Sequence, residues 1–301
     1  MNIIELRVGM NRTARNTVIL LLSSVLLLSG CGGSGGESGG NPQVTIDSQG
    51  VYKNPSANGG PPYTIVDVTP SGQPFLSESV SLVIVPEGND RVMYYTTSSG
   101  ILFVAKVTAV VDSVAGIGTL SGSGTAYAPT RIRGGRVNMT FANGLKVAPA
   151  TISGQYTNAG TLVNGNIIIQ GHESQPISVS ANFDVTLDDG PVAMANVVGN
   201  FQESFNENVP VRPLGTLSVD AAGRVTGTDP DGTFTGTFTI VDGSKNYQRM
   251  TLSFSPNGGG AARIFSGIAG PASPNATGQF RTFDFKLIDA NGTLRYGWLR
   301  Q

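Results

Sequence analysis

Apolar and polar residues alternate with a period of two along much of the chain from Thr45 onward. Because successive side chains of a β-strand point to opposite faces, this alternation predicts strands with one buried and one solvated face. Such strands are typical of antiparallel sheets and barrels. The clearest apolar positions are Ile177, Val179, Ala181, Phe183, Val185 and Leu187; Phe234, Gly236, Phe238 and Ile240; Met250, Leu252 and Phe254; and Phe283, Phe285 and Leu287.

Turn sequences separate the predicted strands in the second half of the chain. Gly, Asn, Asp and Pro gather at strand-length intervals, as they do in hairpin connections. The turns are Asp220-Ala-Ala-Gly223, Asp229-Pro-Asp-Gly232, Asp242-Gly243 and Ala290-Asn-Gly292. They predict eight strands, at 197–205, 214–219, 223–228, 233–241, 246–255, 262–269, 279–289 and 293–300. Eight sequential antiparallel strands close into an up-and-down barrel without exposed edges.

The first half of the chain has a similar pattern with one strand too many. Its nine candidates are 49–53, 79–86, 91–98, 100–111, 116–126, 132–141, 146–157, 161–170 and 175–187, so one of them is expected to be wrong or to lie outside the barrel. Asp188-Asp-Gly-Pro191 interrupts the alternation and marks the predicted boundary. We therefore expect an all-β fold of two small barrels, at 45–188 and 191–301, with a single helical turn in 192–198.

The N-terminal segment has the pattern of an export signal. Residues 17–28 form an apolar run of 12, too short for a membrane-spanning helix of about 20 residues but suited to a signal sequence, and Arg12 and Arg15 precede it. The next four residues, Leu28, Ser29, Gly30 and Cys31, resemble the lipobox of bacterial lipoprotein precursors. The resemblance implies a signal peptide at 1–30 and a Cys31 that receives lipid and becomes the new N-terminus. The alternative is an ordinary secretory signal, or a membrane helix, with a chance cysteine.

A Gly-rich stretch follows the lipobox and predicts a flexible tether at 31–44. In lipoproteins an Asp directly after the cysteine favours retention in the inner membrane. Here Gly32 and Gly33 follow, so the resemblance implies an outer-membrane location, with the periplasmic and surface faces both open. Met10 begins a compact basic segment and is an alternative to Met1 as the translation start.

Composition narrows the classes of partner. Charged residues make up 13% of the chain, and removal of residues 1–30 leaves 16 basic and 19 acidic residues, a net charge of −3. This charge balance does not favour nucleic acid as a partner, and the sequence shows no basic run with interleaved aromatics. The chain has one cysteine, so a lipidated Cys31 leaves no thiol for a disulfide within the body.

Five groups of residues have the composition of chemical sites, and each also has a structural explanation. His172, the single histidine, lacks a second histidine or a free thiol for zinc or triad chemistry and is expected in a turn. Asp229 and Asp231 suit a turn better than a calcium loop, because a third ligand and a distal Glu in register are missing. The Gly-rich segment 118–124 lies among strands, where bending by glycine is expected rather than a phosphate cradle.

The two remaining groups concern carboxylates and aromatics. The acidic residues Asp188, Asp189, Glu203 and Glu207 are expected to be solvated charges rather than acid–base pairs of a glycosidase. Tyr296 and Trp298 share a strand face with Leu294, where closure of the second barrel competes with ligand stacking. We therefore predict no catalytic, cofactor-binding or metal-ligating residues.

The lipobox, the tether and the two β meanders together resemble the barrel-bearing surface lipoproteins of Gram-negative bacteria, such as the families of transferrin-binding protein B and factor H-binding protein. Residues 217–236 also resemble an uncharacterised family of proteobacterial lipoproteins. The resemblance implies a non-enzymatic binding module, attached to the membrane by acyl chains and recognising a protein, glycan or small ligand at the loops of the barrel rims. A structural lipoprotein that assists envelope assembly from the periplasmic face is the alternative, and a carboxylate-based hydrolase is the third class.

Overall fold

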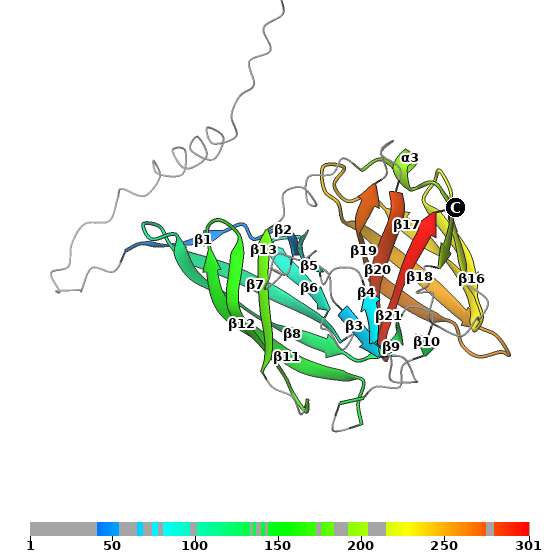
Figure 1. The fold of residues 1–301 in the computed structure, drawn as a ribbon, viewed down its shortest axis with the longest axis horizontal. Helices are drawn as coiled ribbons and strands as arrows, with labels where there is room; N and C mark the ends of the chain where they lie inside the picture. Colours follow the sequence, from blue (N-terminus) through cyan, green and yellow to red (C-terminus); the bar gives the residue numbers. More distant parts are fainter. Residues whose placement is uncertain are drawn as a thin grey trace, which may run out of the picture. The chain divides into compact units, whose positions relative to one another are not determined.

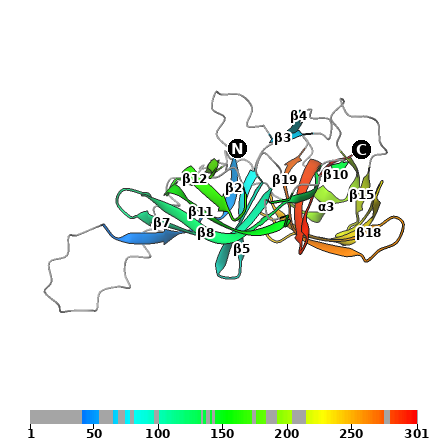
Figure 2. The same ribbon diagram turned by 90° about the horizontal axis from the view of Figure 1, so that it is seen from below.

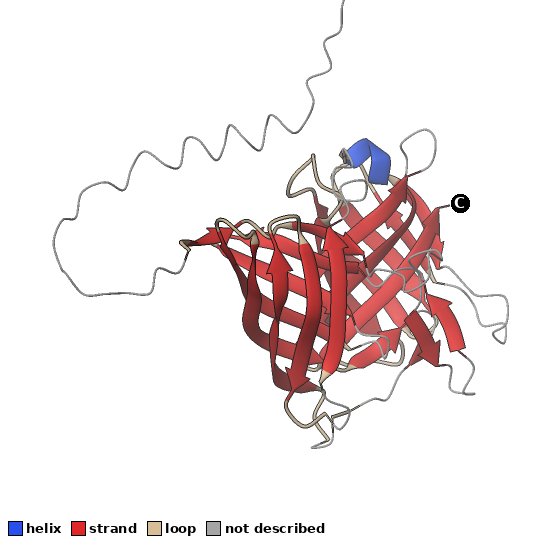
Figure 3. Cartoon of the chain, turned by 60° about the vertical axis from the view of Figure 1, so that its left-hand side comes forward, coloured by secondary structure: helices blue, strands red, loops and turns tan. Residues whose placement is uncertain are grey.

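In the computed structural model, the residues that the structure describes from 41 onward form mostly β-strands and almost no helix (Figures 1 and 3). The structure describes residues 41–53, 65–68, 74–77, 81–96, 101–132, 135–136, 140–141, 144–172, 176–183, 192–203, 215–274 and 280–300. The predicted signal peptide, the lipobox with Cys31 and the Gly-rich stretch lie outside the described residues. Residues 41–301 form one compact unit.

The first barrel is a closed ring of eight antiparallel strands in sequence order. Its last strand returns to pair with its first, because Phe183 of β13 lies opposite Tyr52 of β2. The strands are β2 (Gly50–Lys53), β5 (Ser81–Glu87), β6 (Asp90–Thr96), β7 (Leu102–Asp112), β8 (Ile117–Tyr127), β11 (Val147–Thr157), β12 (Thr161–Ile169) and β13 (Ile177–Phe183). A further strand, β1 (Gln43–Ile46), pairs with the end of β7, and β3 (Ile65–Val68) pairs with β4 (Pro74–Ser77).

The second barrel is also a closed up-and-down ring of eight strands. Its seam joins β14 to β21, with Phe201 opposite Arg300. The strands are β14 (Gly199–Glu203), β15 (Thr216–Val219), β16 (Arg224–Asp229), β17 (Gly232–Thr239), β18 (Gln248–Pro256), β19 (Arg263–Pro274), β20 (Phe280–Asp289) and β21 (Gly292–Arg300). The single helical turn α3 (Met194–Val197) precedes it, as the sequence predicted. The predicted fold class of two small antiparallel barrels is therefore confirmed.

One predicted strand of the first half lies outside the first ring, as the excess of candidates required. Where the sequence predicted a strand at 132–141, the described residues form the end of β9 (Pro129–Ile132) and the short strand β10 (Gly135–Arg136). β9 pairs in parallel with β21, so this short hairpin belongs to the sheet of the second barrel. A segment from the first half of the sequence thus joins the second sheet through main-chain pairing.

Side chains fill both barrels. The buried cluster of the first barrel includes Phe103, Ile152 and Ile167, and that of the second includes Phe234, Phe265 and Phe285. The alternating positions named from the sequence supply many of them: Phe234, Phe238, Met250, Leu252, Phe285 and Leu287 are all buried. Burial of large apolar side chains contributes about 1.5–3 kcal/mol each and stabilises each ring.

Glycines let β8 lie unusually close to its neighbour β7 in the wall of the first barrel. Gly118, Gly122 and Gly124 occupy inward-facing positions opposite β7. A Cβ atom at Gly124 would overlap the carbonyl oxygen of Val104. The Gly-rich segment 118–124 is therefore part of a barrel strand, the explanation that the sequence favoured over a phosphate-binding loop. Figure 2 shows this side of the first barrel from below.

A third buried cluster joins the outer faces of the two barrels. Val83, Val85 and Leu102 of the first barrel pack with Tyr247 and Ile268 of the second, and Ile268 has no exposed surface. Strand β5 is therefore buried on both faces, with Leu82 and Ile84 turned into the first barrel. This double burial explains the unbroken apolar run Leu-Val-Ile-Val at 82–85.

Candidate functional site

A groove lies between the outer faces of the two barrels, beside the buried cluster that joins them. Its volume is about 500 Å³. The first barrel lines it from β5, β6 and β7, and the second barrel from β18, β19 and β20. The lining residues are Glu87, Val92, Tyr94, Val104, Arg249, Met250, Thr251, Ser266, Gly267 and Ile288. Concave sites between two lobes are a common location for ligand binding.

An ion pair between the two barrels forms the polar centre of the groove. Arg249 Nη2 lies 2.6 Å from Glu87 Oε1, and the two side chains are 33% and 37% exposed. The Tyr94 hydroxyl donates to Glu87 Oε1 at 3.4 Å and accepts from Arg249 Nη1 at 3.4 Å. Donors and acceptors at the groove are therefore held at fixed positions while both charged groups remain accessible.

Burial and charge keep these groups protonated at neutral pH. Burial raises the pKa of Tyr94 to about 12, since a phenolate would lose its hydration there. Burial lowers the pKa of Arg249, but Glu87 and Tyr94 together outweigh that effect and the net direction is upward. Tyr94 remains a neutral phenol and Arg249 a guanidinium across the physiological range. Neither group is then available as a general base.

The walls of the groove combine apolar side chains with hydroxyls. Val92 is buried, while Val104 and Ile288 are half-buried and form the apolar part. Thr251 and Ser266 lie opposite one another on β18 and β19, both exposed on the outer face of the second barrel. The site can thus offer two hydroxyls, a carboxylate and a guanidinium above an apolar floor. Its charges cancel.

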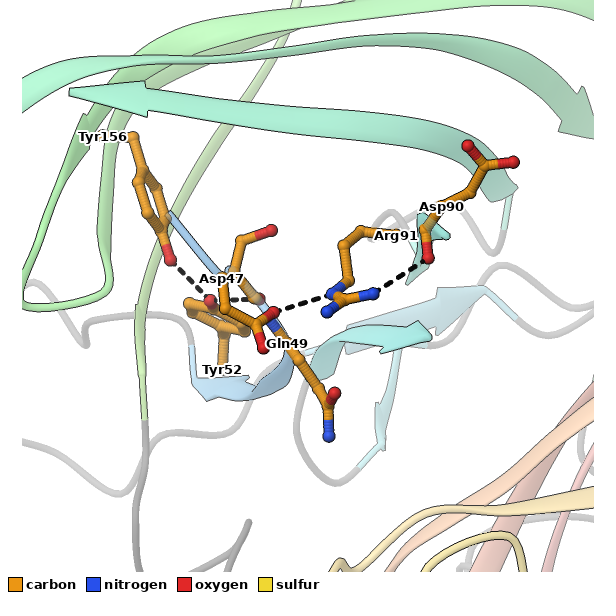
Figure 4. Close-up of polar contacts among 7 residues, drawn as sticks. Asp47, Gln49, Tyr52, Asp90, Arg91 and Tyr156 are labelled. Carbon is orange, nitrogen blue, oxygen red and sulfur yellow. Dashed lines mark hydrogen bonds and ion pairs between the residues drawn. The ribbon is translucent and has the colours of Figure 1, made fainter. Parts of the chain in front are cut away.

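A second polar cluster lies where the chain enters the first barrel, between β1 and β2 (Figure 4). Arg91 Nε donates to Asp47 Oδ1 at 2.7 Å, and the Gln49 backbone N–H donates to the same oxygen at 3.0 Å. Inside the barrel, the Tyr52 hydroxyl donates to the Ser48 carbonyl at 2.6 Å and lies 2.6 Å from the Tyr156 hydroxyl. We call this set the entry cluster. It holds the segment that follows β1 against the barrel.

The entry cluster gives the protein an acid-sensitive contact. The hydrogen bond from Arg91 holds the pKa of Asp47 below its ordinary value of 3.8. A carboxyl group whose folded pKa is lowered stabilises the fold above its unfolded pKa, and that stabilisation is lost as pH falls through the folded pKa. The contribution of Asp47 is therefore complete at neutral pH and disappears in strong acid, below pH about 4.

We expect Asp47→Asn to lower the free energy of unfolding by about 0.5 kcal/mol at pH 7, a small effect because Asp47 is 59% exposed. The difference from the unchanged protein should shrink when the same urea titration is repeated at pH about 3. Glu37→Gln removes one charge from the Gly-rich stretch and serves as the control. A difference that stays constant with pH would show that the Arg91 contact does not act through the ionised carboxylate.

The structure places the other sequence candidates in structural roles or outside the described residues. The His172 backbone N–H donates to the Ile169 carbonyl at 3.1 Å after a turn, and its ring meets Phe141 edge-on with centroids 6.3 Å apart. The Asp229 carboxylate accepts the Asp231 N–H at 2.6 Å within the β16–β17 turn, which the sequence predicted. Groups of three or more potential metal ligands are absent from the residues that the structure describes.

The remaining candidates either lie outside the described residues or have side chains that the structure does not describe. Asp188, Asp189 and Glu207 lie outside them. Glu203 ends β14, and Leu294, Tyr296 and Trp298 belong to β21, where Tyr296 lies opposite Phe285 in the register. The side chains at these four positions are not among those described. The predictions of solvated charges and of barrel closure therefore stay predictions.

Sequence reasoning missed the groove. Tyr94 and Arg249 are 155 positions apart in the chain, and neither has a local pattern that marks it. Glu87 lies in the sequence Glu-Gly-Asn-Asp-Arg at 87–91, whose residue types are those of an ordinary turn. The available signal was the unbroken apolar run at 82–85, which indicates a strand buried on both faces and hence a neighbour outside the barrel.

Comparisons with protein-family models, curated proteins and solved structures found no match for this chain. The resemblance to barrel-bearing surface lipoproteins therefore remains a prediction from the sequence. In the described part of the chain, no helix has the length and apolar character needed to cross a membrane.

Proposed function

We propose that the protein is a lipid-anchored binding module of the bacterial cell envelope and that the groove between its barrels is the ligand site. The anchor follows from the apolar run 17–28 and the residues Leu28, Ser29, Gly30 and Cys31. Two or three acyl chains on Cys31, at about 0.8 kcal/mol per buried CH₂, hold a protein at a membrane nearly permanently. The outer membrane is the proposed location, because Gly32 and Gly33 follow the cysteine.

Binding at the groove is supported by the arrangement of Glu87, Tyr94 and Arg249. Large side chains fill the interiors of both barrels, so recognition falls to an outer surface. At the groove, an accessible ion pair and a phenol stand beside an apolar wall. This ion pair across the groove is the observation on which the proposal depends. We therefore propose the groove as the recognition surface, in place of the rim loops that the sequence favoured.

A neutral glycan is the ligand class that suits this chemistry. Adjacent sugar hydroxyls can accept from a guanidinium while they donate to a carboxylate, and hydrogen bonds to charged groups contribute about 1.5–3 kcal/mol each. Thr251 and Ser266 offer further hydroxyl partners, and the apolar wall can cover the C–H face of a sugar ring. Since the charges of Glu87 and Arg249 cancel, the site has no excess charge for an anionic ligand.

Calorimetric titration with neutral oligosaccharides of glucose, galactose, mannose and N-acetylglucosamine tests this proposal. At least one series should bind, and Arg249→Gln should weaken its binding by roughly 10- to 100-fold, the equivalent of one charged hydrogen bond. Arg263→Gln is the matched control, because Arg263 pairs with Asp289 at 2.7 Å and does not line the groove.

Two results would contradict the assignment of this ligand. One is the absence of binding across all the neutral series. The other is equal weakening by Arg249→Gln and Arg263→Gln, which would indicate a general effect on the fold. Sulfated oligosaccharides that bind more tightly than neutral ones would point to a cationic site elsewhere.

A further inference from the structure

Exposed apolar side chains gather at one end of the first barrel. The register places the β7–β8 turn at 113–116, the β11–β12 turn and the start of β1 at this same end, because Gln43 lies opposite Asp112 and Thr157 opposite Ile117. Phe183 also belongs here, since its N–H donates to the Gly160 carbonyl in the β11–β12 turn. The exposed fractions are 75% for Val114, 46% for Ile117, 40% for Val44 and 36% for Phe183. We call this the entry end.

The most exposed of these residues stands on a well-defined turn. The Asp112 carboxylate accepts the backbone N–H groups of Val114 and Ala115 at 2.8 and 2.7 Å. The turn then closes at Gly116, whose φ of +66° suits glycine and whose N–H donates to the Asp112 carbonyl at 2.8 Å. The isopropyl group of Val114 is thus presented outward by fixed geometry.

Several carboxylates at the entry end are already engaged. Asp112 accepts the turn N–H groups, Asp47 pairs with Arg91 at 2.7 Å, and Asp90 pairs with Lys106 at 2.6 Å. An approaching apolar surface therefore meets carboxylates whose charge is balanced by a partner or by backbone donors. This lowers the cost of bringing that surface close.

The chain that leads to this end is short. Eleven residues, 32–42, separate Cys31 from the first residue of β1. Fully extended they span about 40 Å, and as a flexible Gly-rich chain their average span is about 20 Å. An anchor at Cys31 would keep the entry end near the bilayer, so that even a weak contact is favoured by its high effective concentration.

We propose that the entry end is a membrane-contact surface, in which Val114 of the β7–β8 turn and Ile117 at the start of β8 touch the lipid interface. The proposal rests on the anchor at Cys31 proposed above. It orients the protein with the β7–β8 turn toward the lipid and the opposite end of the first barrel, at Leu145, away from it. A protein partner covering the same residues is the competing occupant.

Brominated-lipid quenching of an added tryptophan tests this orientation. The chain from Cys31 onward contains the whole compact unit 41–301, and its single thiol can be coupled to a maleimide lipid in phosphatidylcholine–phosphatidylethanolamine vesicles. Val114→Trp is compared with Leu145→Trp, a matched exposed position (56%) at the opposite end of the barrel. Trp298 is common to both, so the difference between the variants isolates the new residue.

The tryptophan at 114 should be quenched several-fold more strongly than that at 145. Equal quenching, or none at either position, would overturn the proposal and leave a protein partner as the occupant. If a substitution disturbs the fold, hydrogen exchange of the unsubstituted protein decides: amides 113–117 should exchange several-fold more slowly on vesicles than in solution. Because the lipid is supplied chemically, this outcome is separate from whether cells attach acyl chains to Cys31.

Discussion

Replacement of Cys31 with alanine is expected to stop maturation of the protein and remove it from the outer membrane. Lipid transfer needs the cysteine sulfur as its nucleophile, and the resemblance to lipoprotein precursors implies that the lipid-bearing cysteine is then freed as the new N-terminus. The variant should therefore persist as the uncut chain of 31.2 kDa with residues 1–30 still in place. Its amount in the outer-membrane fraction should fall to background in fractionated cells.

Ser34→Ala is the control for this experiment, because it changes the same stretch without touching the sulfur. It should leave both the size and the location of the protein unchanged. A Cys31→Ala protein that is shortened normally and found in the outer membrane would mean that an ordinary secretory signal, and not a lipobox, precedes the body.

Addition of one methyl group at Gly124 is expected to lower the free energy of unfolding by about 3 kcal/mol. Gly124 lies on β8 between its neighbours in the sheet, Ala105 of β7 and Ala150 of β11. The new Cβ would overlap the Val104 carbonyl oxygen, and a backbone atom held in a sheet ladder cannot move aside as a flexible side chain can. Urea denaturation followed by circular dichroism measures the loss.

Gly243→Ala provides the matched control. Its added Cβ would have the Val192 carbonyl oxygen as its nearest neighbour at 3.3 Å, and Gly243 lies in a loop. That variant should remain within about 0.5 kcal/mol of the unchanged protein. A loss below about 1 kcal/mol at Gly124 would contradict the close approach of β7 and β8 in the wall of the first barrel.

Much of the barrel architecture was predictable from the sequence because barrels make burial periodic. Phe234 and Phe238 alternate with threonines on a strand whose one face is buried, and that contrast is visible without any knowledge of neighbours. Turn residues such as Asp229 and Gly232 then fix where each hairpin reverses. All eight strands of the second barrel were located in this way, to within a few residues at their ends except for β19, which continues to Pro274.

Features that depend on contacts between distant segments could not be predicted from the sequence. Alternation reports that a strand has one buried face, but it does not report which sheet the strand joins. The sequence therefore placed a candidate strand at 132–141 without showing which of the nine candidates lies outside the first barrel, and in the structure β9 pairs with β21. In the same way, the pairing of Glu87 with Arg249 results from how the outer faces of two barrels meet. The alternation of apolar and polar residues along each strand does not predict which outer faces pack against each other.

The attachment of lipid at Cys31 is the claim on which the cellular role depends, and mass spectrometry of the N-terminal peptide from exported protein tests it most directly. The account predicts a chain that begins at Cys31 and carries a diacylglyceryl thioether, with or without a further acyl group on the new amino terminus. An exported chain with an unmodified thiol at Cys31, or one cut at another residue, would contradict it.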